Sequence, residues 1–141
     1  MYNTVHRFFV RGLIMVKTVS LLAVKDNKLL VVLSKKHTLW TPPGGKVEPT
    51  DKNPQAALER EVAEELKIRL TNVREYVSVS GISASGRQVY VYTFFANIVG
   101  KLTIDNEIES IRWIGCTDEE LKTVLPVTRD IMACMQADGY L

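Results

Sequence analysis

The sequence predicts an α+β fold in which helices pack on a mixed β-sheet. Apolar runs rich in valine, leucine and aromatic residues occupy residues 16–34 and 69–99, and such runs are typical of strands. A helix-forming segment at residues 53–66 separates the two runs. Apolar residues recur at helical spacing again from Pro126 onward. Strands, one central helix and terminal helices in this order indicate the α+β class.

Composition limits the function classes. The chain has 141 residues, which is the length of one domain and enough to bury a substantial core. Apolar residues make up 46% of it and charged residues 24%, as in ordinary globular proteins. The net charge of +2 is too small to predict a nucleic-acid or membrane partner. With two cysteines, Cys116 and Cys134, we expect reduced thiols in a cytoplasmic protein rather than a disulfide.

Residues 1–15 are interpreted as an N-terminal arm or an extra strand, and residues 16–141 as a single domain. The first acidic residue is Asp26, and the acid-free, arginine-containing start has a faint likeness to a transit peptide. Its apolar runs are short and interrupted by Arg11, so we do not expect a spanning helix. Met15 stays open as an alternative start.

Two strands and a hairpin turn are expected next. Residues 16–24 and 29–34 are rich in valine and leucine, and Asp26 and Asn27 between them favour a tight turn. Both strands are apolar on both faces. We therefore expect them at the centre of the sheet, covered from two sides.

The central helix begins with a clear signal. Asn53 is a good N-cap, and Pro54 suits the first helical position because no N–H is needed there. At about 100° per residue, Leu58, Val62 and Leu66 form one apolar stripe. We expect this stripe to pack on the sheet.

Three carboxylates lie beside that stripe. Glu61, Glu64 and Glu65 are spaced so that they share one face of the helix, where they repel one another. A hard divalent cation such as Mg²⁺ or Mn²⁺ would neutralise them, because these ions prefer carboxylate oxygens. A tight glycine-rich loop, PPGG at residues 42–45, precedes the helix.

Residues 40–68 resemble the signature of the Nudix hydrolases, the family of MutT-like pyrophosphohydrolases. Gly45 matches its opening glycine, the run REVAEEL at residues 60–66 matches its core, and Ile68 matches its closing apolar residue. The stretch WTPPGGKVE at residues 40–48 is similar to the way many members enter the motif. The resemblance implies the Nudix α/β/α sandwich, a mixed β-sheet with the catalytic helix following a glycine-rich loop.

The resemblance also implies a metal site and catalytic residues. Gly45, Glu61, Glu64 and Glu65 would hold Mg²⁺, with Mn²⁺ as a substitute. Glu61, Glu64 and Arg60 would be catalytic, with Glu61 either a metal ligand or the base. Arg60 is expected to orient one of the glutamates through a bidentate ion pair rather than to touch substrate.

The expected substrate contacts lie at the entrance to the helix. They are the backbone of Gly44 and Gly45, together with Lys46, Glu48 and Trp40. Trp40 could stack on a base, although an indole beside two prolines more often packs in the core.

Two departures from the signature affect this loop. The interval from Gly45 to Arg60 is one residue longer than usual, so the signature's early glutamate corresponds either to Lys52 or to Asp51. The late glycine is replaced by Lys67. That glycine lets the chain leave the helix with positive φ, so Lys67 must avoid this conformation or bear some strain.

The rest of the chain is expected to complete the sheet and close it with helices. Residues 69–80 and 88–99 read as strands; in the second, Tyr90, Tyr92 and Phe94 share a face that either joins the core, which we favour, or lines a nucleotide pocket. Residues 101–104 and 108–114 are short strand candidates. The resemblance implies that a glutamate of this region, Glu107 or Glu109, could join the metal site or act as base. Helices are expected at residues 118–124, capped by Thr117, and from Pro126 onward.

The function implied is divalent-metal-dependent hydrolysis of a pyrophosphate bond in a nucleoside diphosphate linked to another group. A nucleoside triphosphate cleaved to the monophosphate and pyrophosphate is the first choice because the chain is short, and oxidised nucleotides, dinucleoside polyphosphates, RNA 5′ ends and nucleotide sugars stay open. The alternative is a non-catalytic Nudix-like module that senses a nucleotide. The partner is a small-molecule nucleotide in either case, with no membrane and no clear nucleic-acid surface. A homodimer is left open, since the last helix's apolar stripe would form core or a subunit contact.

Overall fold

The structure is a computed structural model that describes residues 9–10, 13–105 and 107–141. Its strands and helices follow the predicted order closely. They are β1 (Phe9–Val10), β2 (Leu13–Ile14), β3 (Val16–Leu22), β4 (Val24–Lys25), β5 (Lys28–Ser34), β6 (Gly44–Lys46), α1 (Pro54–Leu66), β7 (Arg69–Ile82), β8 (Gln88–Val99), β9 (Ile108–Ile114), α2 (Asp118–Leu121) and α3 (Pro126–Ala137).

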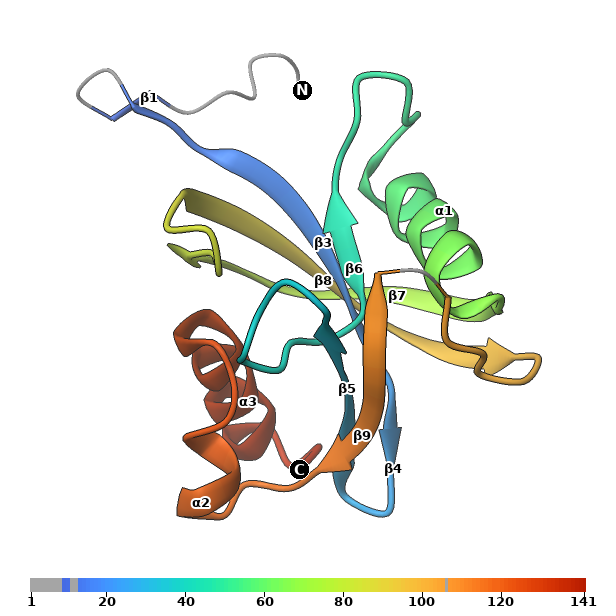
Figure 1. Ribbon diagram of the computed structural model, residues 1–141, viewed down its shortest axis with the longest axis vertical. Coiled ribbons are helices and arrows are strands. Elements are labelled where there is room, and N and C mark those ends of the chain that lie inside the picture. The colour runs from blue at the N-terminus through green and yellow to red at the C-terminus, as the bar shows by residue number, and fades with distance from the viewer. Residues whose placement is uncertain (1–8, 11–12, 106) are drawn as a thin grey trace.

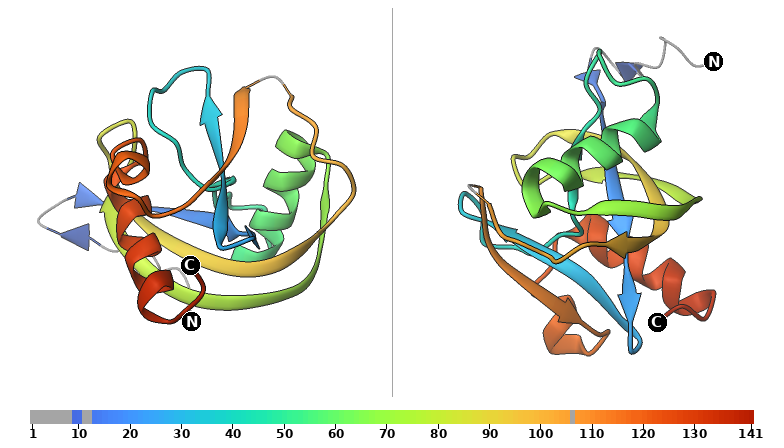
Figure 2. Two further views of the ribbon diagram at one scale, coloured as in Figure 1. Left: turned by 90° about the horizontal axis from the view of Figure 1, so that it is seen from below. Right: turned by 90° about the vertical axis from the view of Figure 1, so that its right-hand side faces the viewer.

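Two sheets form the centre of the molecule. One has the strand order β6-β3-β8-β7, with β3 and β8 parallel and the other pairs antiparallel. The second has the order β4-β5-β9 and is antiparallel throughout. Helix α1 lies on one side of these sheets and α3 on the other (Figures 1 and 2). The α+β prediction, with helices on a mixed sheet, is confirmed, and β3 and β5 are central in their sheets as expected.

The chain changes sheet at Ala23, which the sequence did not predict. The expected strand at residues 16–24 is divided into β3 and β4, and Ala23 between them is 5% exposed. The turn that follows is as expected, because Asp26 and Asn27 have φ angles of 53° and 60°. Two consecutive residues with positive φ suit the tight hairpin that joins β4 to β5.

Helix α1 forms for the predicted reasons. The Asn53 side chain accepts a hydrogen bond from the N–H of Ala56 at 2.8 Å, and Pro54 is the first helical residue. Leu58, Val62 and Leu66 are fully buried. Each such side chain contributes about 1.5–3 kcal/mol on burial. This stripe fixes the rotation of α1 and so decides where its glutamates lie.

The two faces of β8 serve different sides of the molecule. Phe94 and Tyr92 pack in the cluster that contains the apolar stripe of α1, which confirms the core interpretation for these two residues of the aromatic face; Tyr90 belongs to neither core cluster. Val89 and Val91, on the other face, pack in the cluster with α3. The prediction of a strand at residues 101–104 is wrong, because this segment is an irregular connection between β8 and β9.

The C-terminal helices close the second side. Thr117 and Glu120 form a capping box at the start of α2, as the Thr117 prediction implied, but the helix ends at Leu121. In α3, Ile131, Met132 and Met135 are buried. Most of the predicted arm at residues 1–15 lies outside the described residues; within it, β1 pairs with β2. None of the described helices is long and apolar enough to cross a membrane.

Candidate active site

Acidic side chains from two parts of the chain line one cavity, which we call the acidic cavity. Its volume is about 390 Å³. Helix α1 contributes all three of the predicted metal-binding glutamates together with Arg60. The lining residues are Gly45, Glu48, Arg60, Glu61, Glu64, Glu65, Asp105 and Glu107.

Arg60 links the helix to the loop before it. Its Nε and Nη2 donate to Oδ1 and Oδ2 of Asp51, both at 2.9 Å, and Asp51 is only 5% exposed. Its Nη1 reaches Glu61 and Glu64 at 3.4 Å each. The predicted bidentate pair of Arg60 with a helix glutamate is therefore wrong. The lengthened loop places Asp51, and not Lys52, directly beside the guanidinium.

Electrostatics reinforce the Arg60–Asp51 pair. Hydrogen bonding to Arg60 holds the pKa of Asp51 below its ordinary value, and the same contact raises the pKa of Arg60. The N–H of Glu48 also donates to Asp51, at 2.7 Å. The pair thus favours the ionised form of both groups. Arg60 therefore attaches the loop that contains Asp51 to helix α1.

The close approach of Glu61 to the backbone explains why Gly45 is glycine. β6 pairs with β3 in a register that sets Gly45 opposite Val19. A Cβ atom on Gly45 would lie 2.4 Å from Oε2 of Glu61, so a larger residue would displace this carboxylate. Glu61 is 14% exposed, and burial raises its pKa.

Glu65 is the most perturbed carboxyl group of the cavity. Burial, followed by the charges of Glu61, Glu107 and Glu64, raises its pKa to about 7. Carboxylates this close disfavour one another's ionised form unless a cation compensates them. The cavity therefore has the charge balance of a cation site.

The second part of the chain enters the acidic cavity through the β8–β9 connection. Glu107 lines the cavity, whereas Glu109 is exposed on β9, so only the first of the two candidate bases is placed near the helix glutamates. Asp105 also lines it and was not predicted. It pairs with Lys67, which adopts the left-handed conformation (φ 58°) that the missing signature glycine would take.

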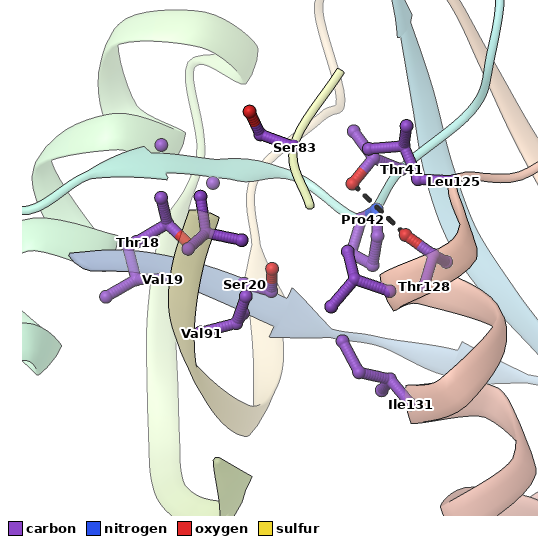
Figure 3. A pocket seen from close by; sticks show the side chains of 14 residues that line it. Thr18, Val19, Ser20, Thr41, Pro42, Ser83, Val91, Leu125, Thr128 and Ile131 are labelled. Carbon is purple, nitrogen blue, oxygen red and sulfur yellow. Dashed lines mark hydrogen bonds between the residues drawn. The ribbon is translucent and has the colours of Figure 1, made fainter. Parts of the chain in front are cut away.

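A second cavity of about 160 Å³ lies beside the first, and we call it the neutral cavity (Figure 3). No charged side chain is among its described lining residues, and hydroxyl groups alternate with apolar ones. The lining residues come from β3, from residues 41–45, from the β7–β8 hairpin, and from α3 with the residue before it. The lining residues are Thr18, Val19, Ser20, Thr41, Pro42, Gly44, Gly45, Ser83, Val89, Val91, Leu125, Val127, Thr128 and Ile131.

The backbone pairing of Trp40 brings two walls of the neutral cavity together. The backbone N–H of Trp40 donates to the carbonyl oxygen of Thr123 at 2.8 Å, and the backbone carbonyl of Trp40 accepts from the N–H of Leu125 at 3.0 Å. This pairing brings Thr41 beside the start of α3, where the hydroxyl of Thr128 donates to that of Thr41 at 3.4 Å (Figure 3). Sequence reasoning missed these hydroxyl residues. The one local signal is Thr128, a polar residue on the buried face of an apolar helix.

Only some of the predicted substrate contacts line the two cavities. Gly44, Gly45 and Glu48 line the cavities. Lys46 is exposed, and its carbonyl accepts from Arg60 Nη2 at 3.1 Å. Trp40 is 7% exposed and packs in the core with the Arg112 guanidinium 4.5 Å from its ring centroid. The packing interpretation of Trp40 is therefore confirmed, and its contact with substrate stays a prediction.

The donor chemistry of the acidic cavity fits a hard divalent cation. Glu61, Glu64, Glu65 and Glu107 offer carboxylate oxygens, and Gly45 leaves open backbone beside them. Across the described ranges, no three carboxylate, imidazole or thiol groups converge on a single point. The carboxylates are gathered around one cavity, and a bound ion would have to draw them together.

Comparison with known proteins decides the family. A model of the NUDIX domain matches residues 15–133 of the chain. The chain belongs to the Nudix family. A CTP pyrophosphohydrolase of Escherichia coli (strain K12) is 33% identical over 110 residues, which cover 75% of this chain and 78% of that protein. The protein is accordingly a Nudix pyrophosphohydrolase, and nothing in these relatives supports a module that senses without cleaving. Nudix hydrolases generally use divalent cations, as the acidic cavity suggests.

Solved structures show the same fold. The solution structure of the E. coli ORF135 protein superposes with a TM-score of 0.69 at 26% identity, covering 92% of this chain and 96% of that one. The crystal structure of a MutT Nudix hydrolase from Burkholderia pseudomallei gives 0.70 at 22% identity, covering 84% and 95%. A MutT protein from Methanosarcina mazei Go1 gives 0.73 at 20% identity, covering 88% and 94%. The expected Nudix architecture is confirmed.

Proposed function

We propose that this Nudix enzyme hydrolyses a nucleoside triphosphate to the monophosphate and pyrophosphate, with Mg²⁺ in the acidic cavity and Mn²⁺ as a substitute. One observation supports this most strongly: Gly45 lines both the acidic and the neutral cavity. A nucleotide carries a polyanionic chain at one end and an uncharged ring at the other. Such a molecule could place each end in the cavity of matching chemistry while crossing Gly45.

In this proposal Glu61, Glu64, Glu65 and the backbone of Gly45 would hold the metal. When bound, the cation neutralises phosphate oxygens and lowers the pKa of a bound water. Arg60 keeps Glu61 and Glu64 in place through its contacts with both. Glu61 serves as a ligand or as the base that accepts a proton from the attacking water, and its raised pKa suits proton transfer.

The neutral cavity would hold the base. Its hydroxyl groups donate and accept hydrogen bonds, so they can pair with the edge of an uncharged ring while the valines contact its faces. CTP is the first nucleotide to test, because the E. coli relative is named for it. We keep Lys46, Glu48 and Trp40 as proposed substrate contacts that variants can test one at a time.

A substrate panel tests the proposed reaction. CTP, dCTP, ATP, GTP, a nucleotide sugar and a dinucleoside polyphosphate would be incubated with Mg²⁺, with Mn²⁺ or with EDTA, and pyrophosphate and orthophosphate measured separately. We expect one or more triphosphates to release pyrophosphate with either metal, CTP among them, and no release in EDTA. Cleavage confined to the nucleotide sugar or dinucleotide, or orthophosphate as the product, would contradict the triphosphate assignment.

The raised pKa of Glu65 predicts how metal binding depends on pH. Its pKa of about 7 in the folded protein lies above the ordinary value of 4.5, so the folded protein holds this proton more tightly than the unfolded chain. The metal-free protein should therefore lose stability as pH rises from 4.5 to 7. Mg²⁺ favours the ionised form and should raise Tm more at pH 8 than at pH 5.5.

Thermal unfolding with and without Mg²⁺ at the two pH values measures this effect. Glu65→Gln serves as the control, because the glutamine amide does not titrate. In this variant the increase in Tm caused by Mg²⁺ should depend less on pH than in the wild type. An equal Mg²⁺ shift at both pH values in the wild type would contradict the assignment of Glu65 to the metal.

The cysteines bear on the proposed location of the enzyme. Cys116 and Cys134 are free thiols, as expected of a cytoplasmic protein, and we keep that location as a proposal. A free nucleotide is the proposed partner. A homodimer stays a prediction.

A further inference from the structure

Lys67 occupies a position where a side chain is disfavoured. It follows the last turn of α1 with φ 58° and ψ 38°, and its N–H donates to the carbonyl of Val62. The left-handed conformation is strained for a lysine and relaxed for glycine.

The Lys67 side chain reaches the β8–β9 connection. Its Nζ lies 2.8 Å from Oδ2 of Asp105, which lines the acidic cavity. A backbone hydrogen bond joins the same two segments, since Thr103 N donates to Leu66 O at 3.0 Å. The connection is thus attached to the end of α1 at two neighbouring points, one of which depends on a side chain.

Glu107 lies just beyond this attachment. Its carbonyl accepts from Lys35 N at 2.9 Å, which fixes the far end of the connection to the loop after β5. Glu107 is thus itself the second anchor, and it lines the acidic cavity together with the glutamates of α1. The Lys35 contact holds Glu107 directly and the Lys67–Asp105 ion pair holds the chain two residues earlier, so both contribute to where its carboxylate lies.

We propose that Lys67 is a positioning residue whose ion pair with Asp105 holds the β8–β9 connection against α1, so that Glu107 faces the helix glutamates across the acidic cavity. Its catalytic consequence rests on the proposed function, because it requires that cavity to be the site of hydrolysis. The attachment itself does not, and it can be tested in the enzyme without metal or nucleotide.

Hydrogen exchange of the Thr103 amide tests the attachment. Lys67→Met removes the ammonium, Lys67→Gly also relaxes the backbone, and Lys67→Arg keeps a cation at the same place. We expect Thr103 to exchange about threefold faster or more in the Met and Gly variants and at the wild-type rate in the Arg variant. Lys101→Met, which removes an exposed lysine of the same connection, is the matched control and should leave the rate unchanged.

Steady-state kinetics and Tm test the positioning role. Loss of an exposed ion pair corresponds to a factor of up to about five, so we expect kcat/KM to fall by about that factor in Lys67→Met and in Lys67→Gly. Lys67→Gly should have the higher Tm of the two because its backbone is relaxed. Asp105→Asn should match Lys67→Met, and the double variant should be no worse than either single one.

Each outcome decides one part of the proposal. An unchanged Thr103 exchange rate in Lys67→Met would overturn the attachment, whatever the activity. Faster exchange with wild-type kcat/KM would overturn the positioning role. So would a kcat/KM that falls in Lys67→Met and recovers in Lys67→Gly along with Tm, because the loss would then reflect stability alone. If the wild type hydrolyses no nucleotide, the proposed function fails, and the exchange rates still decide whether Lys67 holds the connection.

Discussion

Replacing Glu64 by glutamine is expected to lower kcat by about two orders of magnitude or more, because charge stabilisation by a bound metal is worth several kcal/mol. The change removes one negative charge and almost no volume. Glu64 is 60% exposed, and its contact with Arg60 is a single one at 3.4 Å. The fold should therefore be unaffected, and the loss should appear in turnover rather than in Tm.

Glu59→Gln is the matched control for this prediction. Glu59 lies on the same helix, is exposed, and accepts a hydrogen bond from Gln55 away from the acidic cavity. The substitution removes the same charge and should leave kcat within about twofold of the wild type, since surface changes of this kind are small. Both variants would be assayed at saturating substrate with Mg²⁺. Wild-type turnover by Glu64→Gln would show that Glu64 does not hold the metal.

Replacing Gly44 by alanine should have the largest effect on stability. The added Cβ would lie 1.8 Å from the carbonyl oxygen of Val19 and 2.8 Å from its carbon, and both are backbone atoms of β3. Neither can move without breaking the pairing of β6 with the centre of the sheet. We expect the free energy of unfolding to fall by about 3 kcal/mol or more, the upper end of the cost of overpacking.

Gly86→Ala separates this clash from the cost of backbone conformation. Gly86 has φ +85°, and no atom lies within 4 Å of where a Cβ would stand, so alanine there bears conformational strain alone. That strain should cost about 1–2 kcal/mol. Urea unfolding of the two variants gives the comparison, and equal destabilisation would mean that β6 can shift away from β3 without loss.

Local signals were enough to predict helix α1. Asn53 caps it and Pro54 begins it, both as read from the sequence. The buried stripe of Leu58, Val62 and Leu66 then fixes the rotation of the helix and so the neighbouring face, where the glutamates lie. Cap, first residue and stripe all lie within one segment, so they require no knowledge of the rest of the chain.

Long-range contacts could not be predicted in the same way. The neutral cavity brings Thr41 to Thr128, which are separated by 87 positions, and no local pattern relates them. The division of the first strand at Ala23 depends on which sheet each half joins. Arg60 was expected to pair with a glutamate of its own helix, and its bidentate partner is instead Asp51, which the path of the preceding loop brings beside it.

The strand wrongly expected at residues 101–104 has a related cause. Its alternation of polar and apolar residues suits a strand. A strand also needs a neighbour with free backbone groups, and here Thr103 N donates instead to Leu66 O at the end of α1. The segment consequently joins the helix rather than the sheet.

The central claim is that the glutamates of α1 hold the divalent cation at which a phosphoanhydride is cleaved. An anomalous-difference map from a crystal grown with Mn²⁺ and a non-hydrolysable nucleoside triphosphate tests it most directly. We predict a peak in the acidic cavity, within bonding distance of Glu64 and Glu65, with the phosphate chain beside it. An ordered nucleotide bound elsewhere, with no peak between those glutamates, would contradict the claim.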